Sequence, residues 1–355
     1  MPKTAIIGTT SWGITLGLLV ARKGREVRFW TRTEREARQI RKKGVNQERF
    51  PEVILPENVM VSSDMAEIMD DTSEVILAVP SATMRQNIVQ LSPHLSRNTV
   101  IISASKGLEI GTNKRMSEVI AEEIEERYHA NICVLSGPQL AREIMQDLPA
   151  ASVIAAENHN TARKAQRLLT TPNFCVFTNS DVIGVELAGA LKNILAIGAG
   201  IADGLGYGDN ARAAFITRGL TEITALGMSL GANPLTFSGL AGLGDVIATC
   251  TSPLSRNHHV GVELSKGIPL AEVLDDLMPQ VAEGVNTTMV AKNLSEELGL
   301  EMPITEKLYQ ILYEESDPLQ ATIELMGGTT RHELSGRRWR LFSFFRRNDR
   351  QGSRG

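Results

Sequence analysis

Eight short apolar segments alternate with helix-length segments over the first half of this 355-residue chain. The apolar segments span residues 4–7, 26–30, 59–62, 74–79, 99–103, 132–136, 151–156 and 174–178. Patterned segments at 34–43, 84–91, 114–127 and 161–169 lie between them. Continuous apolar runs suit strands that are covered on both faces, and the intervening helices supply that cover. The alternation therefore predicts a wound parallel α/β sheet.

The strand pattern disappears after residue 181. Segments 182–202, 211–230, 270–277, 284–298 and 303–314 have helical character and are separated by turns rich in glycine and proline. We therefore expect an α/β domain over residues 1–190 and an all-α domain over 191–336. A third segment, the basic tail 337–355, should be disordered.

The segment 182–202 is almost wholly apolar but carries Lys192 in its middle. A membrane span is one interpretation, although a central lysine costs about 2.5–3.5 kcal/mol on insertion scales and Glu186 adds to that cost. A buried core helix with a snorkelling lysine is a second interpretation. A catalytic lysine at a cleft is a third. Small residues at helical spacing around Lys192 would leave room beside its ammonium; these are Ala188, Gly189, Ala196 and Ala199.

Composition limits the classes of partner and the redox compartment. The tail holds seven arginines against one aspartate, so removing its charge of +6 from the total of −4 leaves −10 on the body. An acidic body argues against nucleic acid as a partner. The three cysteines, Cys133, Cys175 and Cys250, form no CxxC pair, which predicts reduced thiols, a cytoplasmic protein and no metal site. No signal peptide precedes the first apolar run.

A glycine turn follows the first predicted strand, where a wound sheet binds a dinucleotide. The turn G-x-G-x-x-G lets pyrophosphate approach the backbone at a helix N-terminus. Here the outer glycines are Gly8 and Gly13, but Thr10 replaces the middle glycine, with Ser11 and Trp12 after it. We expect the Thr10 side chain to crowd the pyrophosphate or shift the turn, leaving nucleotide binding intact but weakened.

The end of the second predicted strand bears on the choice of cofactor. NAD binding usually places an acidic residue there, to contact the ribose. This chain has Thr31 and Arg32 instead, with Arg35 close behind. Arginines suit a 2′-phosphate, so we favour NADP over NAD, although these arginines could equally be ordinary surface residues.

Two further motifs suggest a substrate site. Residues 105–107 (Ser-Lys-Gly) and 136–139 (Ser-Gly-Pro-Gln) follow predicted strands and should line the ligand edge of the sheet. In the helical half, glycines at 239–244 precede Asp245, and Ser255, Arg256 and Asn257 follow. Hydroxyl, guanidinium and amide groups beside exposed backbone N–H groups can hold an oxyanion or a phosphate. The adjacent His258 and His259 lack metal-ligand spacing and are interpreted as surface residues.

These motifs, in this order, resemble the bacterial NAD(P)-dependent glycerol-3-phosphate dehydrogenases over residues 1–330. The resembling segments also include 186–193 (Glu-Leu-Ala-Gly-Ala-Leu-Lys-Asn) and Glu283-Gly284. The resemblance implies a Rossmann-like α/β N-terminal domain plus an all-α C-terminal domain, in a homodimer. It also implies reversible reduction of dihydroxyacetone phosphate to sn-glycerol 3-phosphate by NADPH or NADH, which supplies the backbone for glycerophospholipid synthesis.

The resemblance also implies roles for individual residues. Lys192 would be the proton donor and acceptor, with Asp245 and Lys106 beside it as further catalytic residues. The substrate would contact Lys106, Gly137, Gln139, Lys192, Asp245, Ser255, Arg256 and Asn257. The cofactor would contact Gly8, Thr10, Ser11, Trp12, Gly13, Arg32, Lys106, Ala141, Arg256, Val281 and Glu283.

Three residues depart from the family pattern: Thr10, Gln139 where a smaller polar residue is usual, and Asn286 where arginine is common. Thr10 leaves open a non-catalytic nucleotide sensor, and a hydroxy-acid dehydrogenase is a further alternative. A sensor has no need of Lys106, Lys192 and Asp245 together, and a hydroxy acid has no need of the Ser-Arg-Asn segment. Arginines and aromatic residues in the tail could contact an anionic membrane surface, but we favour disorder.

Overall fold

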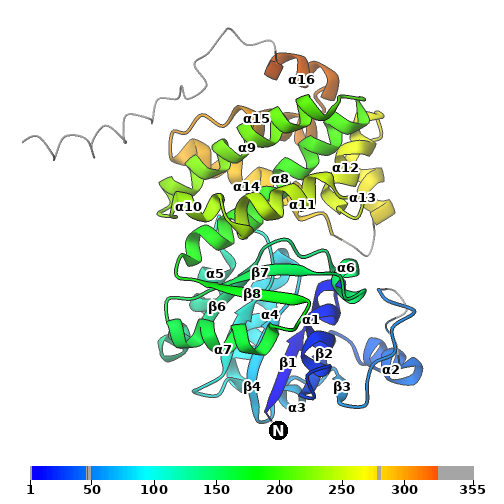
Figure 1. Ribbon diagram of the computed structural model, residues 1–355, viewed down its shortest axis with the longest axis vertical. Helices are drawn as coiled ribbons and strands as arrows, with labels where there is room; N and C mark the ends of the chain where they lie inside the picture. The colour runs from blue at the N-terminus through cyan, green and yellow to red at the C-terminus, as the bar shows by residue number, and fades with distance from the viewer. Residues whose placement is uncertain (1, 45, 47–48, 278–280, 327–355) are drawn as a thin grey trace, which may run out of the picture.

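The computed structural model describes residues 2–44, 46, 49–277 and 281–326. The predicted tail 337–355 lies outside the described residues. Figure 1 shows a sheet flanked by helices at the N-terminal end of the chain and a bundle of helices stacked above it.

All eight predicted strands form within two residues of their expected bounds. They are β1 (Lys3–Ile7), β2 (Glu26–Trp30), β3 (Val59–Ser62), β4 (Thr72–Leu77), β5 (Val100–Ser103), β6 (Ile132–Ser136), β7 (Ala150–Ala155) and β8 (Phe174–Asn179). They make one sheet in the order β3-β2-β1-β4-β5-β6-β7-β8. The strands β1 to β6 are parallel, whereas β7 pairs antiparallel with β6 and parallel with β8. The expectation of a wholly parallel sheet is therefore wrong for the last two strands.

Both faces of the sheet are covered over most of its width, as the apolar runs predicted, but the outer strand β8 exposes Cys175 and Phe177. Alternate residues of β1 point to opposite sides: Ile6 packs in one core with α1 (Ser11–Ala21) and α7 (His159–Leu169), and Ile7 packs in another with α4 (Met84–Leu91) and α5 (Met116–Glu123). The remaining helices of the sheet domain are α2 (Glu34–Lys43), α3 (Met65–Met69) and α6 (Ala141–Met145), with short 3₁₀ turns η1 (Ser81–Thr83), η2 (Ser92–His94) and η3 (Glu126–Asn131).

The helical half is built around α8 (Val182–Gly204). Around it lie α9 (Asp209–Ser229), α10 (Pro234–Phe237), the π-helical turn η4 (Leu240–Gly244), α11 (Asp245–Thr251), α12 (Arg256–Ser265), α13 (Leu270–Leu277), α14 (Glu283–Glu297), α15 (Pro303–Tyr313) and α16 (Pro318–Met326). Helices α10, α11, α12 and α16 were not expected from the sequence.

Among the described helices, α8 alone is long and apolar enough to cross a membrane, and 89% of its apolar window is buried inside the protein. Its N-terminal end is tied to neighbouring elements. Asp181 caps its first turn by accepting from the Gly184 N–H at 2.9 Å, and the largely buried Glu186 accepts from Arg115 at 2.7 Å, next to the start of α5. The apolar composition of α8 is therefore explained by its position in the core.

Small residues let α12 approach α8 closely. A Cβ added at Gly200 would lie 2.0 Å from the His258 carbonyl oxygen, and one added at Gly261 would lie 2.0 Å from the Ile197 carbonyl oxygen. The alanines near Lys192 are also closely packed. Ala188, Ala196 and Ala199 are fully buried in the hydrophobic core. The expectation that these alanines leave room for a substrate is wrong, because neighbouring side chains occupy that room.

Candidate active site

Lys192, Asp245 and Lys106 come together although they are far apart in the chain. Lys192 lies midway along α8, Asp245 begins α11, and Lys106 follows β5. The two Asp245 carboxylate oxygens are shared between the lysines: Lys192 Nζ lies 3.0 Å from Oδ1, and Lys106 Nζ lies 2.6 Å from Oδ2. Lys106 also donates to the Gly137 carbonyl oxygen at 2.8 Å, at the end of β6. The carboxylate thus joins the sheet edge to the helical half.

Charge is unbalanced at this junction. The exposed fraction is 1% for Asp245 and 7% for Lys192, and the Lys106 side chain is 16% exposed. Burial lowers the pKa of Lys106 to about 8, and Lys192 adds to the lowering while Asp245 opposes it. When both lysines are protonated, one carboxylate leaves one positive charge in excess. A fixed positive charge in a poorly hydrated site is suited to stabilise a developing oxyanion.

Thr249 is a further residue of this cluster that we did not anticipate. Its Oγ1 accepts from Lys192 Nζ at 2.5 Å and donates to Asp245 Oδ1 at 3.2 Å. Thr249 follows Asp245 by four positions on α11, so both side chains lie on one helix face. That spacing was readable from the sequence, but only after the segment had been recognised as a helix.

The predicted Ser-Arg-Asn segment forms the N-terminus of α12. Ser255 Oγ caps the helix by accepting from the His258 N–H at 3.2 Å. Asn257 donates to Asn193 Oδ1 at 2.9 Å and accepts from the Gly284 N–H at 2.9 Å. The Arg256 side chain remains exposed. Because Asn193 follows Lys192, these contacts fix the helix N-terminus beside the lysine cluster, and such a terminus with a free guanidinium suits an anion.

Glu283 connects the start of α14 to the sheet edge. Its carboxylate accepts from the Ser81 N–H at 3.0 Å and from Ser81 Oγ at 2.5 Å. Burial raises the pKa of Glu283, while the Ser81 hydrogen bonds and the nearby Arg256 charge oppose that rise. Desolvation by the surrounding protein lowers the pKa of Arg256, and the Glu283 charge opposes that lowering. Arg256 and Glu283 therefore lie at one junction between the two halves.

The glycine turn fits a pyrophosphate. Gly8 has a φ of +105°, and a Cβ added at Gly13 would lie 2.3 Å from the Gly8 carbonyl oxygen, so both positions require glycine. Thr10 caps α1: its hydroxyl accepts from the Gly13 N–H at 3.0 Å and donates to the Ala78 carbonyl oxygen at 2.8 Å. The hydroxyl is thus bonded within the protein, and the first amides of α1, those of Ser11 and Trp12, are not used by this cap.

The other predicted cofactor residues lie at the ends of neighbouring elements. Trp12 stacks edge-on against Phe174 with ring centroids 6.4 Å apart. Arg32 follows β2 and is exposed, without an ion pair to any described residue. Ala141 begins α6, and Val281 lies half-buried just before α14.

Gln139 and His258 both contact neighbouring side chains. The Gln139 amide donates to Ser152 Oγ at 2.5 Å, and its Oε1 is buried without a partner among the described residues, so this oxygen is available to a ligand hydroxyl. His258 is not a surface residue as predicted. Its side chain is only 13% exposed, and its Nε2 lies 2.8 Å from Asp203 on α8. This pairing could not be predicted from local patterns, because the two residues are 55 positions apart.

A dinucleotide turn beside a buried lysine pair and an anion-binding helix N-terminus defines a nicotinamide-dependent dehydrogenase of a phosphorylated substrate. Comparison with known proteins agrees. A family model described as NAD-dependent glycerol-3-phosphate dehydrogenase N-terminus matches residues 3–162, and the model described as the C-terminus of the same family matches residues 181–323. The chain belongs to the NAD-dependent glycerol-3-phosphate dehydrogenase family.

Individual relatives cover nearly the whole chain. It is 56% identical over 348 residues to a glycerol-3-phosphate dehydrogenase (NAD(P)+) of Dehalococcoides mccartyi, covering 98% of this chain and 97% of that one. A Geobacter relative of the same name is 46% identical over 91% of this chain and 96% of its own. The crystal structure of the Coxiella burnetii glycerol-3-phosphate dehydrogenase superposes with a TM-score of 0.86 at 37% identity, covering 92% of this chain and 98% of that one. The protein is thus an NAD(P)-dependent oxidoreductase that interconverts dihydroxyacetone phosphate and sn-glycerol 3-phosphate.

Proposed function

We propose that Lys192 is the general acid and base of this reaction. In the reducing direction, protonated Lys192 stabilises the negative charge that grows on the substrate carbonyl oxygen and donates the proton. Bound NAD(P)H supplies the hydride. The observation that carries this assignment is the shared Asp245 carboxylate, which holds Lys192 and Lys106 at 3.0 and 2.6 Å.

Asp245 and Lys106 then have different roles, one in orienting Lys192 and the other in supplying charge. Asp245 orients the Lys192 ammonium together with Thr249, which lies 2.5 Å from Lys192 Nζ. Lys106 contributes a second positive charge at the junction of substrate and nicotinamide. Because two ammonium groups share one carboxylate, each is readily drawn to an incoming oxygen.

Substrate binding is assigned to the residues around this cluster. The phosphate lies on the N-terminus of α12, held by the Arg256 guanidinium and backbone amides. Ser255 and Asn257 fix that terminus through the cap and the Asn193 contact. Gly137 and Gln139 form the opposite wall, on the sheet side of Lys106.

Cofactor binding is assigned to the glycine turn and its surroundings. The pyrophosphate lies on Gly8 to Gly13, including Thr10, Ser11 and Trp12, where any added Cβ at the two glycines would collide with backbone. Ala141, Arg256, Val281 and Glu283 line the rest of the site, with Lys106 at its reactive end. The exposed Arg32 supports a preference for NADP over NAD, because a guanidinium suits a 2′-phosphate.

Domain division, compartment and oligomeric state complete the proposal. We divide the chain into a dinucleotide-binding domain over 1–190, a substrate domain over 191–336 and a tail over 337–355. The enzyme acts in the cytoplasm as a homodimer, and its product supplies glycerophospholipid synthesis.

The substitution Lys192→Met tests the catalytic assignment. It keeps an apolar stem of similar length in the core and removes the ammonium, so turnover should fall by about 10²–10⁴-fold. Oxidation of NADPH and of NADH with dihydroxyacetone phosphate gives the rates, and circular dichroism checks the fold. Lys266→Met is the matched control, since Lys266 lies on the surface at the end of α12. A Lys192→Met rate within threefold of the parent enzyme would refute the assignment.

A further inference from the structure

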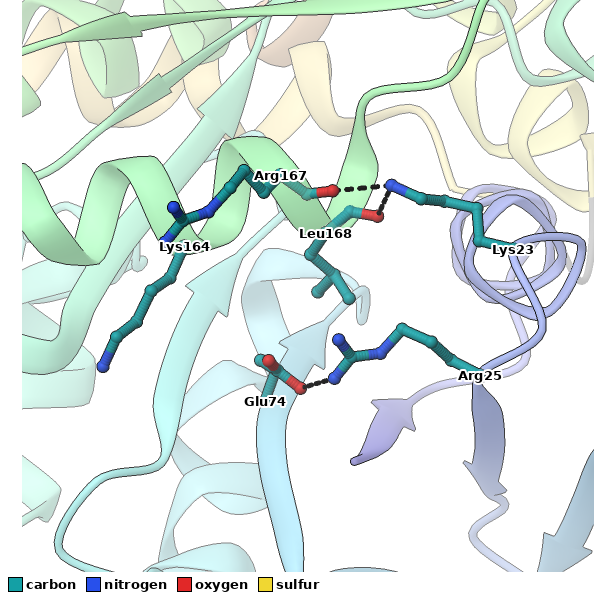
Figure 2. A pocket seen from close by; sticks show the side chains of 6 residues that line it. All are labelled: Lys23, Arg25, Glu74, Lys164, Arg167 and Leu168. Carbon is teal, nitrogen blue, oxygen red and sulfur yellow. Dashed lines mark hydrogen bonds and ion pairs between the residues drawn. The ribbon is translucent and has the colours of Figure 1, made fainter. Parts of the chain in front are cut away.

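A second polar cavity lies at the opposite edge of the sheet from the active site. It encloses about 280 Å³ and is lined by Lys23, Arg25, Glu74, Lys164, Arg167 and Leu168. Figure 2 shows that these residues come from the turn between α1 and β2, from β4 and from the helix α7. Because the dinucleotide turn lies at the other end of α1, this cavity, the α1–α7 pocket, is separate from the cofactor site.

Positive charge dominates the α1–α7 pocket. Four of its lining residues are cationic and one is acidic, so three positive charges are unbalanced. Glu74 is already paired with Arg25. Lys164 and Arg167 are exposed on one side of α7 and form no ion pair with a described residue. Glu74 also lies close enough to Lys164 for their charges to interact, but this single lining carboxylate cannot balance four lining cations.

Lys23 is held at the rim of the pocket by the end of α7. Lys23 Nζ donates to the last carbonyls of α7, with the oxygens of Arg167, Leu168 and Thr170 at 2.6, 2.9 and 2.8 Å. This ammonium caps the helix C-terminus and cannot move away. Its pKa is lowered first by burial and then by repulsion from Arg25. An anion in the pocket would relieve that repulsion.

Arg25 supplies an unused hydrogen-bond donor. Its terminal nitrogen pairs with Glu74, but its Nε is buried and has no partner among the described residues. A buried donor left unpaired is unfavourable by about 1–3 kcal/mol. Guanidinium groups bind phosphate oxygens through parallel N–H bonds, and lysines add charge at the same oxygens.

We propose that the α1–α7 pocket binds a small anion bearing one or two phosphate groups, at a site distinct from the substrate phosphate site at Arg256. Lys164 and Arg167 on α7 and Arg25 on the facing turn supply the positive charge for the anion. The volume suits pyrophosphate or a small phosphate ester. This binding function is additional to the dehydrogenase reaction and does not depend on the catalytic assignment.

Calorimetric titration of inorganic pyrophosphate into the full chain tests the site. Saturating NADPH occupies the dinucleotide turn, and an Arg256→Gln background weakens the substrate phosphate site. We expect one binding event per chain in this background. Adding Lys164→Gln and Arg167→Gln should weaken it at least tenfold, because both residues are exposed helix positions whose loss leaves the fold intact.

A matched double variant separates specific binding from general attraction. Arg163→Gln with Arg97→Gln removes the same charge from exposed positions that do not line the pocket, and it should change affinity less than threefold. Titration with glucose 6-phosphate then shows whether an ester or a free phosphate is preferred, and tighter binding of either supports the site. Absence of binding in the NADPH-saturated Arg256→Gln protein, or equal weakening by the two double variants, would overturn the proposal.

Discussion

Lys106 and Asp245 meet at 2.6 Å across the junction between the sheet and the helical half. Lys106 follows a strand and Asp245 begins a helix 139 residues later. The same carboxylate holds Lys192 through its other oxygen. The active-site charge cluster is therefore also a contact between the two halves, so substitutions there should affect stability as well as turnover.

The first prediction concerns Asp245→Asn. This change leaves two buried ammonium groups without their counter-charge, and it should lower the free energy of unfolding by about 3 kcal/mol. Urea denaturation followed by fluorescence measures the loss. The control is Asp209→Asn, because Asp209 pairs with Arg212 but is 91% exposed, and its loss should change stability by less than about 1 kcal/mol. Equal losses in the two variants would contradict the buried-cluster account.

A second prediction concerns pH. Lys106 has a pKa of about 8 in the folded protein, so it loses its charge as the pH rises through 8. The kcat/KM for dihydroxyacetone phosphate should therefore fall above pH 8. The unfolded chain, whose lysines keep an ordinary pKa near 10.5, binds more protons between pH 8 and 10.5, so this group makes folding more favourable as pH rises there. The decline in activity thus cannot result from unfolding caused by Lys106.

The variant Lys106→Arg checks the source of that decline. A guanidinium remains charged over the whole accessible range, so the alkaline fall should disappear even if the absolute rate is lower. Rates are measured from pH 6.5 to 10 at saturating NADPH. An unchanged alkaline fall in Lys106→Arg would show that another group titrates.

A third prediction concerns cofactor choice. Arg32→Gln should raise the KM for NADPH by about tenfold, the value of one charge-assisted hydrogen bond, and leave the KM for NADH within twofold. Arg38→Gln is the control, because Arg38 lies on the helix that follows and is paired with Glu34. Steady-state rates with each cofactor give the comparison. If NADPH and NADH respond alike, Arg32 does not contact the 2′-phosphate.

The fourth prediction concerns Thr10→Gly. The variant loses a helix cap and a hydrogen bond to Ala78, so the free energy of unfolding should fall by about 1 kcal/mol. NADPH affinity, measured by fluorescence titration, should change less than threefold because the hydroxyl already points into the turn. Thr10→Ser retains both bonds and should match the parent enzyme. A tenfold gain in affinity for Thr10→Gly would mean that the threonine crowds the pyrophosphate after all.

Much of the sheet domain was predictable because most of its strands are buried on both faces. Segments such as 100–103 and 132–136 are short continuous apolar runs, and their length together with their β-branched residues favours strand over helix. The reversal at β7 was not predictable, since strand direction leaves no mark on such a run. The connection after Ser136 contains only the five-residue helix α6, which is shorter than the helices that usually make parallel crossovers.

The helical half was predicted less completely. Helix α11 contains β-branched Val246, Ile247 and Thr249, which have low helix propensity. Helix α12 begins with the Ser-Arg-Asn segment, which was interpreted as a ligand loop; Ser255 is in fact its cap. Missing these helices also concealed Thr249 and the pairing of His258 with Asp203. Pairwise contacts between distant residues depend on helix packing, which local patterns do not contain.

The central position of α8 bears on how the protein opens and closes. Eighteen of its residues are buried, namely Gly184, Val185 and every residue from Leu187 to Ala202. Glu186 itself is tied to Arg115 in the sheet domain. Backbone amides in such a helix can exchange hydrogen with solvent only when the surrounding structure unfolds. The amides around Lys192 should thus be among the last in the molecule to take up deuterium. The catalytic ammonium therefore belongs to the segment whose local unfolding is slowest.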